Sequence, residues 1–411
     1  MIDQAALRVE IESELRNNLV PFWREHSVDH DRGGFIAEMA NDGSVLEDAP
    51  RGLILNTRLL WAFAALHRHL GDTSDLELAR RAFRYLDSRF RDPDHGGYFW
   101  RLDAGGRPLD RSKKTYGQAF CVYALSELHL ATGDSSPLER AQDVYRLIEE
   151  HARDRTFGGY LEARAADWAE AQELRLSDKD MNEAKSMNTH LHVLEAYTNL
   201  YRAWPDPGLA LRLEEVIAIF GRFIISRDVG DRHLHHFFDE RWNLRSDTCT
   251  YGHDIESAWL LCEAAEVLSN PELAATVRLW AVDLARTTLA EAIDGDGGLA
   301  YEGRGGEITN PHRDWWCQAE AVVGFWQVYQ LTGEAAFAEA AAACWRFIDR
   351  HQADRTRGEW FWRVLADGTI DESEPKVSEW KGPYHTVRMC LEMLRRLAIK
   401  HDGRRHEPAG I

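Results

Sequence analysis

The chain has 411 residues, with 49 lysines and arginines against 68 aspartates and glutamates, so its formal net charge is −19 at pH 7. This acidity excludes nucleic acids and anionic membranes as expected partners and favours a neutral or cationic ligand. The sequence has no run of about 18 uncharged apolar residues and no signal-peptide pattern at its start. Six scattered cysteines without a C-x-x-C pair are typical of reduced thiols, so we expect a cytoplasmic protein without structural zinc.

A Gly-Gly pair followed by an apolar or aromatic residue recurs along the chain. Most successive copies are about 62 residues apart, and one longer interval leaves room for a weak copy. A fixed period of this length indicates a repeated supersecondary unit that cannot bury its apolar face alone. We count six copies, the last two of them degenerate: Gly33-Gly34-Phe35, Gly96-Gly97-Tyr98, Gly158-Gly159-Tyr160, Gly297-Gly298-Leu299, Gly358-Glu359-Trp360 and the region around His235-His236-Phe237.

Each repeat contains two helical patterns of different character. Segment 76–90 carries one apolar stripe among Arg and Glu, as an outer helix with a solvated face does. Segments 255–268 and 319–331 are apolar on almost every side, which predicts enclosed helices. The turns between them, such as Gly71 and Asp72, end one helix with glycine and begin the next with an acidic residue. In chain order we predict helices over 4–26, 54–70, 74–90, 116–131, 137–152, 184–203, 208–226, 253–268, 272–290, 314–331, 335–351 and 383–399.

Six inner and six outer helices make an all-α (α/α)6 barrel, which closes around one core, so we expect a single domain over residues 1–400. The Gly-Gly segments then lie in loops that lead into the inner helices, as short β-hairpins over 97–100 and 359–362 at one end of the barrel. Residues 401–411 have too little apolar content to order themselves and are expected to form a flexible tail. An open α-solenoid of the same helix pairs is the structural alternative.

The first two turns of the predicted inner helices carry polar and aromatic side chains that a purely structural core does not need. Because the inner helices of such a barrel run parallel, these groups should converge on one mouth. Neighbours three or four residues apart, such as His253 and Glu256, share a helix face. Arg58 lies in an apolar stretch and has to be paired or face a ligand, since an unpaired buried guanidinium is too costly. The full set is Asn56, Arg58, Tyr116, Gln118, Asn188, His192, His253, Glu256, Trp316, Glu320, Trp380 and His385.

Several other chemistries fit these residues less well. The sequence has no H-E-x-x-H, P-loop, G-x-S-x-G or dinucleotide-binding motif. His190 and His192 lie about 200° apart on a helix, so they cannot share a metal ion without distortion, and no metal is expected. Two of the carboxylates would make an inverting glycosidase on the same barrel type, but they leave His253 and His385 without a task.

The set fits proton transfer at a carbon next to a carbonyl. That step needs a base with a pKa near neutral, an acid that returns the proton, and donors for an enediolate oxygen. The positive end of a helix dipole favours a neutral imidazole, whereas Glu256 beside His253 favours the charged form. We therefore expect two histidine pKa values to be separated, so that one histidine starts neutral and the other protonated. Trp316 and Trp380 offer flat apolar faces to a neutral sugar.

Five segments of the chain resemble the cellobiose 2-epimerases of the N-acylglucosamine 2-epimerase superfamily. The resemblance extends from about residue 10 to 400 and is most specific over 178–201. At Cys317 the sequence departs from the family pattern Trp-Trp-Pro-Gln, in which proline follows the second tryptophan. The segments are 51–58 (RGLILNTR), 185–201 (KSMNTHLHVLEAYTNLY), 251–256 (YGHDIE), 315–320 (WWCQAE) and 380–385 (WKGPYH).

This resemblance implies an (α/α)6 barrel that reversibly epimerises C2 of the reducing-end glucose of β-1,4-linked disaccharides, cellobiose to glucosyl-mannose and lactose to epilactose. It implies that no metal or nucleotide cofactor is needed. It also implies that His253 and His385 are the acid/base groups on opposite faces of C2. The other matching residues are His192 and Arg58 around the C1 and C2 oxygens, Tyr116 and Asn188 beside them, Glu256 and Glu320 holding hydroxyls or orienting histidines, and Trp316 and Trp380 as aromatic walls.

The resulting hypothesis is a ring-opening, deprotonation and reprotonation cycle on a neutral oligosaccharide, carried out by a monomer or weak homodimer. The direction in which each histidine acts stays open. The nearest alternative is an aldose–ketose isomerase or a 2-epimerase acting on free mannose or glucose. More distant alternatives are an (α/α)6 glycoside hydrolase and a non-catalytic sugar-binding or scaffold repeat protein.

Overall fold

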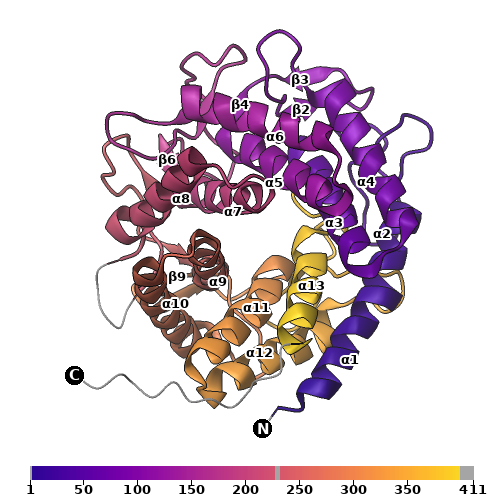
Figure 1. Cartoon of the computed structure of the whole chain (residues 1–411). Helices are drawn as coiled ribbons and strands as arrows, with labels where there is room; N and C mark the ends of the chain where they lie inside the picture. Colours follow the sequence, from indigo (N-terminus) through magenta and orange to yellow (C-terminus); the bar gives the residue numbers. More distant parts are fainter. Residues whose placement is uncertain (1, 227–231, 399–411) are drawn as a thin grey trace.

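The computed structural model describes residues 2–226 and 232–398. Within this part of the chain the helices form two concentric rings (Figure 1). The inner ring consists of α3 (Leu53–Leu70), α5 (Thr115–Thr132), α7 (Met187–Ala203), α9 (Tyr251–Leu268), α11 (Trp315–Thr332) and α13 (Tyr384–Ala398). The outer ring consists of α1 (Gln4–Glu14), α2 (Val20–His26), α4 (Thr73–Tyr85), α6 (Ser135–Leu147), α8 (Pro207–Ile219), α10 (Pro271–Ala292) and α12 (Ala335–Phe347).

The prediction of an all-α (α/α)6 barrel is confirmed. Each predicted helix is present, with ends that agree to within about three residues; the predicted end at 399 lies outside the described residues. The N-terminal helix is interrupted by a wider π-helical turn, Leu15–Leu19, which separates α1 from α2. Similar turns extend four other outer helices: Leu86–Phe90 after α4, Ile148–Ala152 after α6, Phe220–Ile224 after α8 and Ile348–Gln352 after α12.

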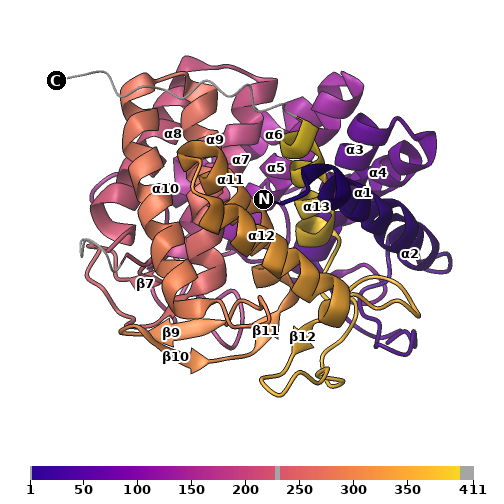
Figure 2. The same cartoon turned by 90° about the horizontal axis from the view of Figure 1, so that it is seen from below.

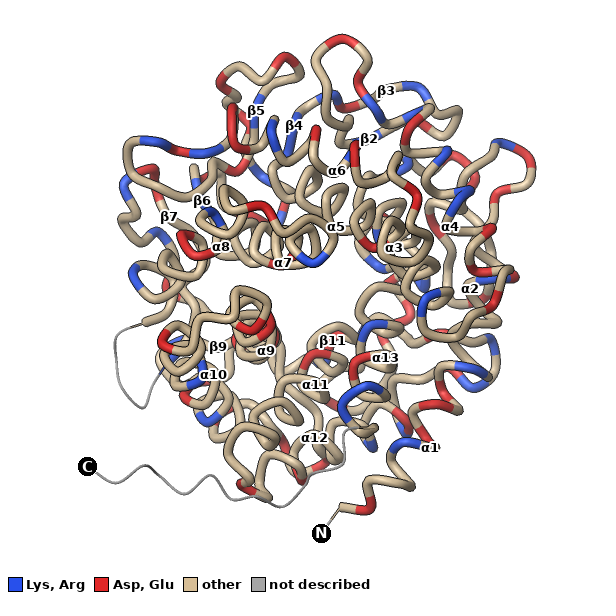
Figure 3. Tube along the Cα trace, viewed as in Figure 1, with Lys and Arg blue, Asp and Glu red and all other residues tan. Residues whose placement is uncertain are grey.

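The two rings differ as their apolar patterns predict. Inner helices are buried along most of their length, and Trp259 and Trp326 are among the largest fully buried side chains. Charged side chains lie mainly on the outer helices and the loops (Figure 3). The hairpin turns after α3, α5 and α11 end in Gly71, Gly133 and Gly333, with φ of 75°, 72° and 73°. Glycine adopts this left-handed conformation without strain, so each turn ends one helix and reverses the chain.

The Gly-Gly repeat corresponds to one antiparallel bridge per unit. In each unit the residue after the outer helix pairs with the residue that follows the Gly-Gly position. In the fourth unit the bridge residue is Leu234, whereas the sequence placed this copy around Phe237. The predicted position is therefore wrong by three residues. The predicted hairpins over 97–100 and 359–362 are likewise reduced to single bridges. The six bridges join Val28 to Phe35, Arg91 to Tyr98, Arg153 to Tyr160, Ile225 to Leu234, Ile293 to Leu299 and Ala353 to Trp360.

Short strands gather at one end of the barrel, as Figure 2 shows for β7, β9, β10, β11 and β12. They pair antiparallel, and most pairs join the strand before one inner helix to a loop of the next repeat, which links neighbouring repeats around the ring. The pairs are β1 (Arg51–Gly52) with β2 (Arg101–Leu102), β2 with β3 (Pro108–Asp110), β4 (Lys113–Lys114) with β5 (Ala163–Arg164), β6 (Lys185–Ser186) with β7 (Phe237–Phe238), β8 (Cys249–Thr250) with β9 (Glu302–Arg304), β9 with β10 (Glu307–Asn310), and β11 (Arg313–Asp314) with β12 (Arg363–Val364).

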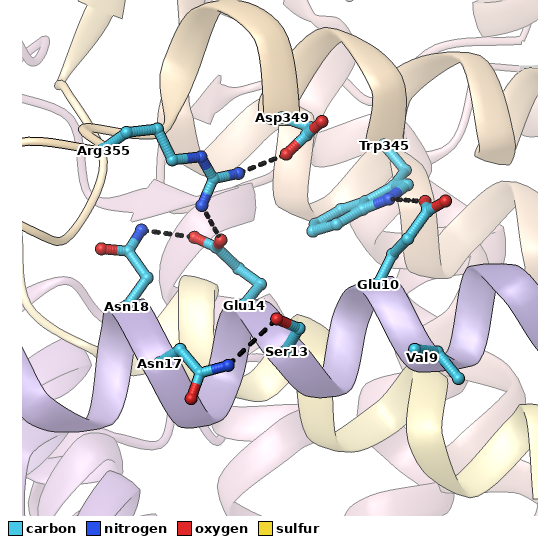
Figure 4. Close-up of a pocket in the computed structure, with 9 residues that line it drawn as sticks. All are labelled: Val9, Glu10, Ser13, Glu14, Asn17, Asn18, Trp345, Asp349 and Arg355. Atoms are coloured by element: carbon cyan, nitrogen blue, oxygen red, sulfur yellow. Dashed lines mark hydrogen bonds and ion pairs between the residues drawn. The ribbon is translucent and has the colours of Figure 1, made fainter.

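The ring is closed, so the open α-solenoid alternative is wrong. Helix α13 packs against both α3 and α11, and α1 packs against α13. A polar groove of about 480 Å³ runs along this seam (Figure 4). There the buried Glu14 accepts hydrogen bonds from the indole N–H of Trp360 at 2.7 Å and from Arg355. The indole of Trp345 donates to Glu10 at 2.8 Å. These bonds connect the first repeat to the last.

All six cysteines are free thiols and are buried. Among the described residues, no helix is both long and apolar enough to cross a membrane. The single domain over 1–400 stays a prediction, and the predicted tail over 401–411 lies outside the described residues.

Candidate active site

Four predicted site residues occupy the same position on four inner helices. Arg58, His192, Glu256 and Glu320 are each the sixth residue of their helix, α3, α7, α9 and α11 respectively. All four are buried. Because each of these helices starts at the strand end of the barrel, one repeated position produces one layer of side chains around the axis.

The fourth residue of the inner helices has a structural task instead. Gln118 donates to the carbonyl of Tyr98 at 2.8 Å and accepts from its N–H at 2.9 Å. Gln318 makes the same two bonds to Leu299, both at 2.8 Å. His190 accepts the corresponding backbone N–H of its own repeat at 2.9 Å. Gln118 therefore holds a Gly-Gly loop rather than joining the site, and His190 points away from it as expected.

His385 is supported by a buried carboxylate. Its Nδ1 lies 2.6 Å from Glu320 Oε1. The other oxygen of Glu320 accepts the indole N–H of Trp259 at 2.9 Å. A carboxylate only accepts hydrogen bonds, so Nδ1 carries the proton and Nε2 is the imidazole atom that is free to take one.

Arg388 links three buried carboxylates, although it is not among the predicted residues. Its guanidinium lies 2.5 Å from Glu256 and 2.7 Å from Glu320, and it also contacts Glu195. One cation faces three acids in a site closed to solvent. Burial and the charge of Glu320 therefore raise the pKa of Glu256 to about 8, although Arg388 acts in the opposite direction. This shift favours the protonated form of Glu256, while its Oε1 accepts a hydrogen bond from Arg388.

His192 is oriented in the same way as His385. Its Nδ1 lies 3.0 Å from Glu195 Oε2, and the hydroxyl of Tyr384 donates to the same oxygen at 2.6 Å. Burial opposes the ionisation of Glu195, but Arg388 and His192 lower its pKa to about 2. The ring of Tyr116 packs edge-on against His192 at 4.9 Å. This imidazole is thus fixed by a carboxylate that stays charged.

His253 has neutral support. Its Nδ1 contacts the hydroxyl of Thr250, which lies 3.2 Å from Nε2 of His236. The same His236 nitrogen accepts the backbone N–H of Thr250 at 3.1 Å. Glu256 was expected to favour the charged form of His253, but its side chain bonds to Arg388 instead. No carboxylate among the described residues forms an ion pair with His253.

Burial favours the neutral form of all three histidines of the site. It lowers the pKa of His192, and it lowers the pKa of His253 and His385 well below the ordinary value. The positive charges of Arg58 and Arg388 add to the effect at His385. These directions run against the expectation that one histidine starts protonated, which stays a prediction.

Arg58 is a buried cation with neutral partners. It donates to the hydroxyl of Tyr116 at 3.0 Å and to the carbonyl of Trp380, and it lies over the rings of Phe120 and Tyr384 at 4.9 and 5.0 Å. Within the described part of the chain it forms no ion pair with a carboxylate, and its Nε is buried without a hydrogen-bond partner. Burying such a charge is costly unless an anion or a strongly polar ligand group completes it.

The structure places Trp380, Asn56 and Asn188, three residues of the predicted site, in different surroundings. Trp380 was expected in the first turns of an inner helix but lies in the loop before α13, with its ring 6.1 Å from Tyr116 and 6.0 Å from Trp100. Asn56 turns back along its own helix and its amide nitrogen donates to a backbone carbonyl at 2.8 Å. The amide oxygens of Asn56 and Asn188 are both buried without a partner among the described residues.

The indole of Trp316 lies between the two histidines of the acid/base hypothesis. Its ring is 4.7 Å from the ring of His253 and 5.8 Å from that of His385. These histidines come from α9 and α13, the two helices that flank α11. Cys317, where the family pattern has proline, is buried within regular helix and leaves this arrangement intact. Two imidazoles from different repeats thus border one flat apolar surface.

Comparisons with known proteins give the same picture. The sequence profile of N-acylglucosamine 2-epimerase (GlcNAc 2-epimerase) matches residues 34–388. The chain belongs to this family. A cellobiose 2-epimerase from Bacteroides fragilis is 41% identical over 392 residues, which cover 94% of this chain and 98% of the relative. The structure of a cellobiose 2-epimerase from Bacillus thermoamylovorans B4167 matches with a TM-score of 0.90 and 36% identity, covering 95% of this chain and 100% of that one.

A D-mannose isomerase from Marinomonas mediterranea is more distant within the comparison, at 26% identity over 380 residues, which cover 89% of this chain and 92% of the relative. The chain is thus more similar to the cellobiose 2-epimerases than to this isomerase. The prediction of an isomerase of the cellobiose 2-epimerase group is confirmed.

Three residues of this epimerase's site were missed from the sequence: Glu195, Tyr384 and Arg388. Glu195 follows His192 by three residues, and Arg388 follows His385 by three, the same spacing that connects His253 with Glu256. The spacing rule applied to every site histidine would have found the two charged residues. Nothing in the local pattern distinguishes Tyr384 from a core aromatic residue.

By distance alone, Glu256, Glu320 and His385 could share a metal ion. Arg388 already bonds to both carboxylates at 2.5 and 2.7 Å. A second cation at this point would be repelled by the guanidinium. The arrangement therefore suits hydrogen bonding and proton transfer better than metal binding.

Proposed function

We propose that the chain catalyses cofactor-independent epimerisation at C2 of the reducing-end glucose of β-1,4-linked disaccharides, converting cellobiose to glucosyl-mannose and lactose to epilactose. The observation that carries this proposal is the pair of imidazoles, His253 and His385, whose rings lie 4.7 and 5.8 Å from the ring of Trp316. Two bases that border one apolar surface are what a proton transfer between the two faces of one carbon requires.

In the proposed reaction His385 removes the C2 proton of the open-chain glucose through Nε2. Its Nδ1 faces Glu320, so the imidazolium that forms is stabilised by a carboxylate that is already in place. The C2–C3 bond of the enediolate then rotates, and His253 returns a proton to the opposite face. In the reverse direction the two histidines exchange roles.

The proton that His253 returns has to be acquired during the cycle, because burial favours the neutral form of both imidazoles. Ring opening supplies no net proton, because O5 takes one up as the O1 hydroxyl loses one. In the proposed cycle His253 therefore takes its proton from solvent before it protonates C2, and His385 releases the C2 proton to solvent at the end of the cycle.

Arg58 and His192 are proposed to lie around the C1 and C2 oxygens of the sugar. Arg58 is a buried cation without a carboxylate partner in the described part of the chain, so developing negative charge would complete its environment. His192 carries its proton on Nδ1, toward Glu195. Its Nε2 and the amide oxygen of Asn188 are therefore proposed to accept hydrogen bonds from sugar hydroxyls, with Tyr116 beside His192. The guanidinium of Arg58 is the donor that stabilises charge appearing only in the transition state.

The remaining residues are proposed to bind the neutral sugar. Trp316 and Trp380 offer ring faces to the C–H side of a pyranose, while Glu256, whose raised pKa favours its protonated form, and Glu320 bind hydroxyls. We infer a cytoplasmic monomer or weak homodimer that acts on a neutral oligosaccharide without metal or nucleotide.

The test is incubation with cellobiose, lactose, glucose and mannose separately in D2O, with product analysis by chromatography and NMR. A disaccharide 2-epimer that carries deuterium at C2 is expected. A ketose as the main product would show an aldose–ketose isomerase instead, and turnover of only the monosaccharides would overturn the disaccharide specificity. Tight sugar binding without any product would show a binding protein.

A further inference from the structure

Five of the six repeats hold their Gly-Gly loop with the same ion pair. An aspartate directly after the loop's bridge residue pairs with a lysine or arginine ahead of the following inner helix. The basic partner is largely buried in each case. The pairs are Asp29 with Arg51, Asp92 with Lys113, Asp154 with Lys185, Asp294 with Arg313 and Asp354 with Lys376.

The fourth repeat replaces both members of this pair. Ser226 follows its bridge residue Ile225, and Cys249 stands two residues before α9, where four of the other repeats have Arg or Lys two residues before their helix. His233 and Asp254 lie beside Cys249. The cation of the other repeats has therefore given way to a thiol and an imidazole, two groups that bind metal ions when deprotonated.

The geometry of this cluster is compact. One ligand atom each from His233, Cys249 and Asp254 lies within 4.8 Å of the others. His233 Nδ1 is 2.7 Å from Asp254, and its Nε2 is 3.3 Å from Glu291. The Asp254 side chain is fully buried, whereas His233 and Glu291 keep 13% and 18% of their side-chain surface exposed. An ion can therefore approach from the His233 and Glu291 side.

We propose that His233, Cys249 and Asp254 form a binding site for a divalent transition-metal ion of the zinc type, with Glu291 orienting the imidazole from its far nitrogen. Mixed sulfur, nitrogen and oxygen ligands suit Zn²⁺ and Co²⁺ rather than Mg²⁺ or Ca²⁺. With tetrahedral metal–ligand bonds of about 2.0–2.3 Å, ligand atoms lie about 3.3–3.8 Å apart. Binding therefore requires the cluster, whose atoms lie within 4.8 Å of one another, to contract, and the 2.7 Å contact between His233 and Asp254 to open. Three protein ligands leave a fourth position for water.

In this site the metal ion takes the place of the proton between His233 and Asp254. Metal ions bind the thiolate and the neutral imidazole, so the titration is carried out above neutral pH. The site's role would be to join the loop at His233, strand β8 and helix α9, as the ion pairs do in the other repeats.

The test is titration of the full chain with Co²⁺, which reports thiolate ligation by a sulfur-to-cobalt charge-transfer absorption. One equivalent is expected to produce this band, and Zn²⁺ but not Mg²⁺ should displace it. Cys249→Ala should abolish the band. The matched control Cys262→Ala, at a buried cysteine of α9, should keep it. Glu291→Gln should weaken Co²⁺ binding by about 10–100-fold, the usual effect of losing a group that orients a ligand.

These measurements do not use epimerase activity, so they stand apart from the proposed function. A wild-type chain without the band at saturating Co²⁺ would overturn the site. A band that survives in Cys249→Ala, or that is lost in Cys262→Ala, would place the metal elsewhere. The cluster of Glu256, Glu320 and His385 has no sulfur ligand, so binding there would give no such band.

Discussion

The two histidines beside Trp316 are supported in different ways. His385 faces Glu320, and that carboxylate is itself held by Arg388 and Trp259. His253 faces the hydroxyl of Thr250, which leads to the neutral imidazole of His236. Burial lowers the pKa of both histidines, yet only one of them has an anion in contact with its ring.

This difference shows how the group that contacts Nδ1 suits one histidine to accept a proton and another to release one. A carboxylate stabilises the imidazolium that forms when a proton is taken up, whereas a hydroxyl does so only weakly. In the proposed reaction His385 is the stronger base, and His253 releases its proton more readily.

The largest expected effect comes from removing either histidine. His253→Ala and His385→Ala should each reduce the rate of cellobiose epimerisation by about 10²–10⁴-fold, the contribution of a positioned acid or base. The measurement is initial-rate kinetics by chromatography. His190→Gln is the matched control and should stay active, because glutamine makes the equivalent loop contact in α5 and α11. A near-wild-type rate in either alanine variant would refute the two-histidine scheme.

Substitutions at the two buried arginines, Arg388 and Arg58, should affect the free energy of unfolding and the epimerase activity to different extents. Arg388→Met leaves three buried carboxylates without their cation and should lower the free energy of unfolding by about 3–5 kcal/mol. Arg58→Met removes no ion pair among the described residues, so it should lose epimerase activity with a much smaller loss of stability. Urea unfolding followed by tryptophan fluorescence measures both. Equal destabilisation by the two substitutions would contradict the difference drawn between them.

The smallest effect should distinguish the supports of the two histidines. Thr250→Val removes one neutral hydrogen bond, worth about 0.5–1.5 kcal/mol, and should slow epimerisation by about tenfold at most. Glu320→Gln keeps an acceptor near His385 but removes the charge, so its rate loss should be larger.

The pH profile of these variants gives an independent readout. Burial lowers the pKa of His385, so the neutral base persists on acidification and the wild-type kcat/KM should fall only below the ordinary histidine pKa of about 6.5. Glu320→Gln removes an anion that favours the imidazolium and should move this fall to still lower pH. Thr250→Val should leave its position unchanged. If Glu320→Gln and Thr250→Val lose rate equally and neither shifts the pH profile of kcat/KM, the assignment of His385 as the stronger base is wrong.

Much of the fold could be predicted from the sequence because it depends on local patterns. Apolar periodicity located the helices, and glycines such as Gly71 and Gly133 located the turns, since a left-handed residue is required there. The weak fourth copy was misplaced because its Gly-Gly pair is replaced and its loop ends at Leu234.

The sequence by itself determined the six-unit period, the helices of both rings and the layer of polar residues at the starts of the inner helices. These features follow from contacts between near neighbours in the chain. Only the tertiary structure decided the partners within that layer. Glu320 serves His385, 65 residues away, and Glu256 serves Arg388, 132 residues away, rather than His253 on its own helix. Buried charges pair with groups on other inner helices, and those neighbours are set by closure of the ring, which no local spacing encodes.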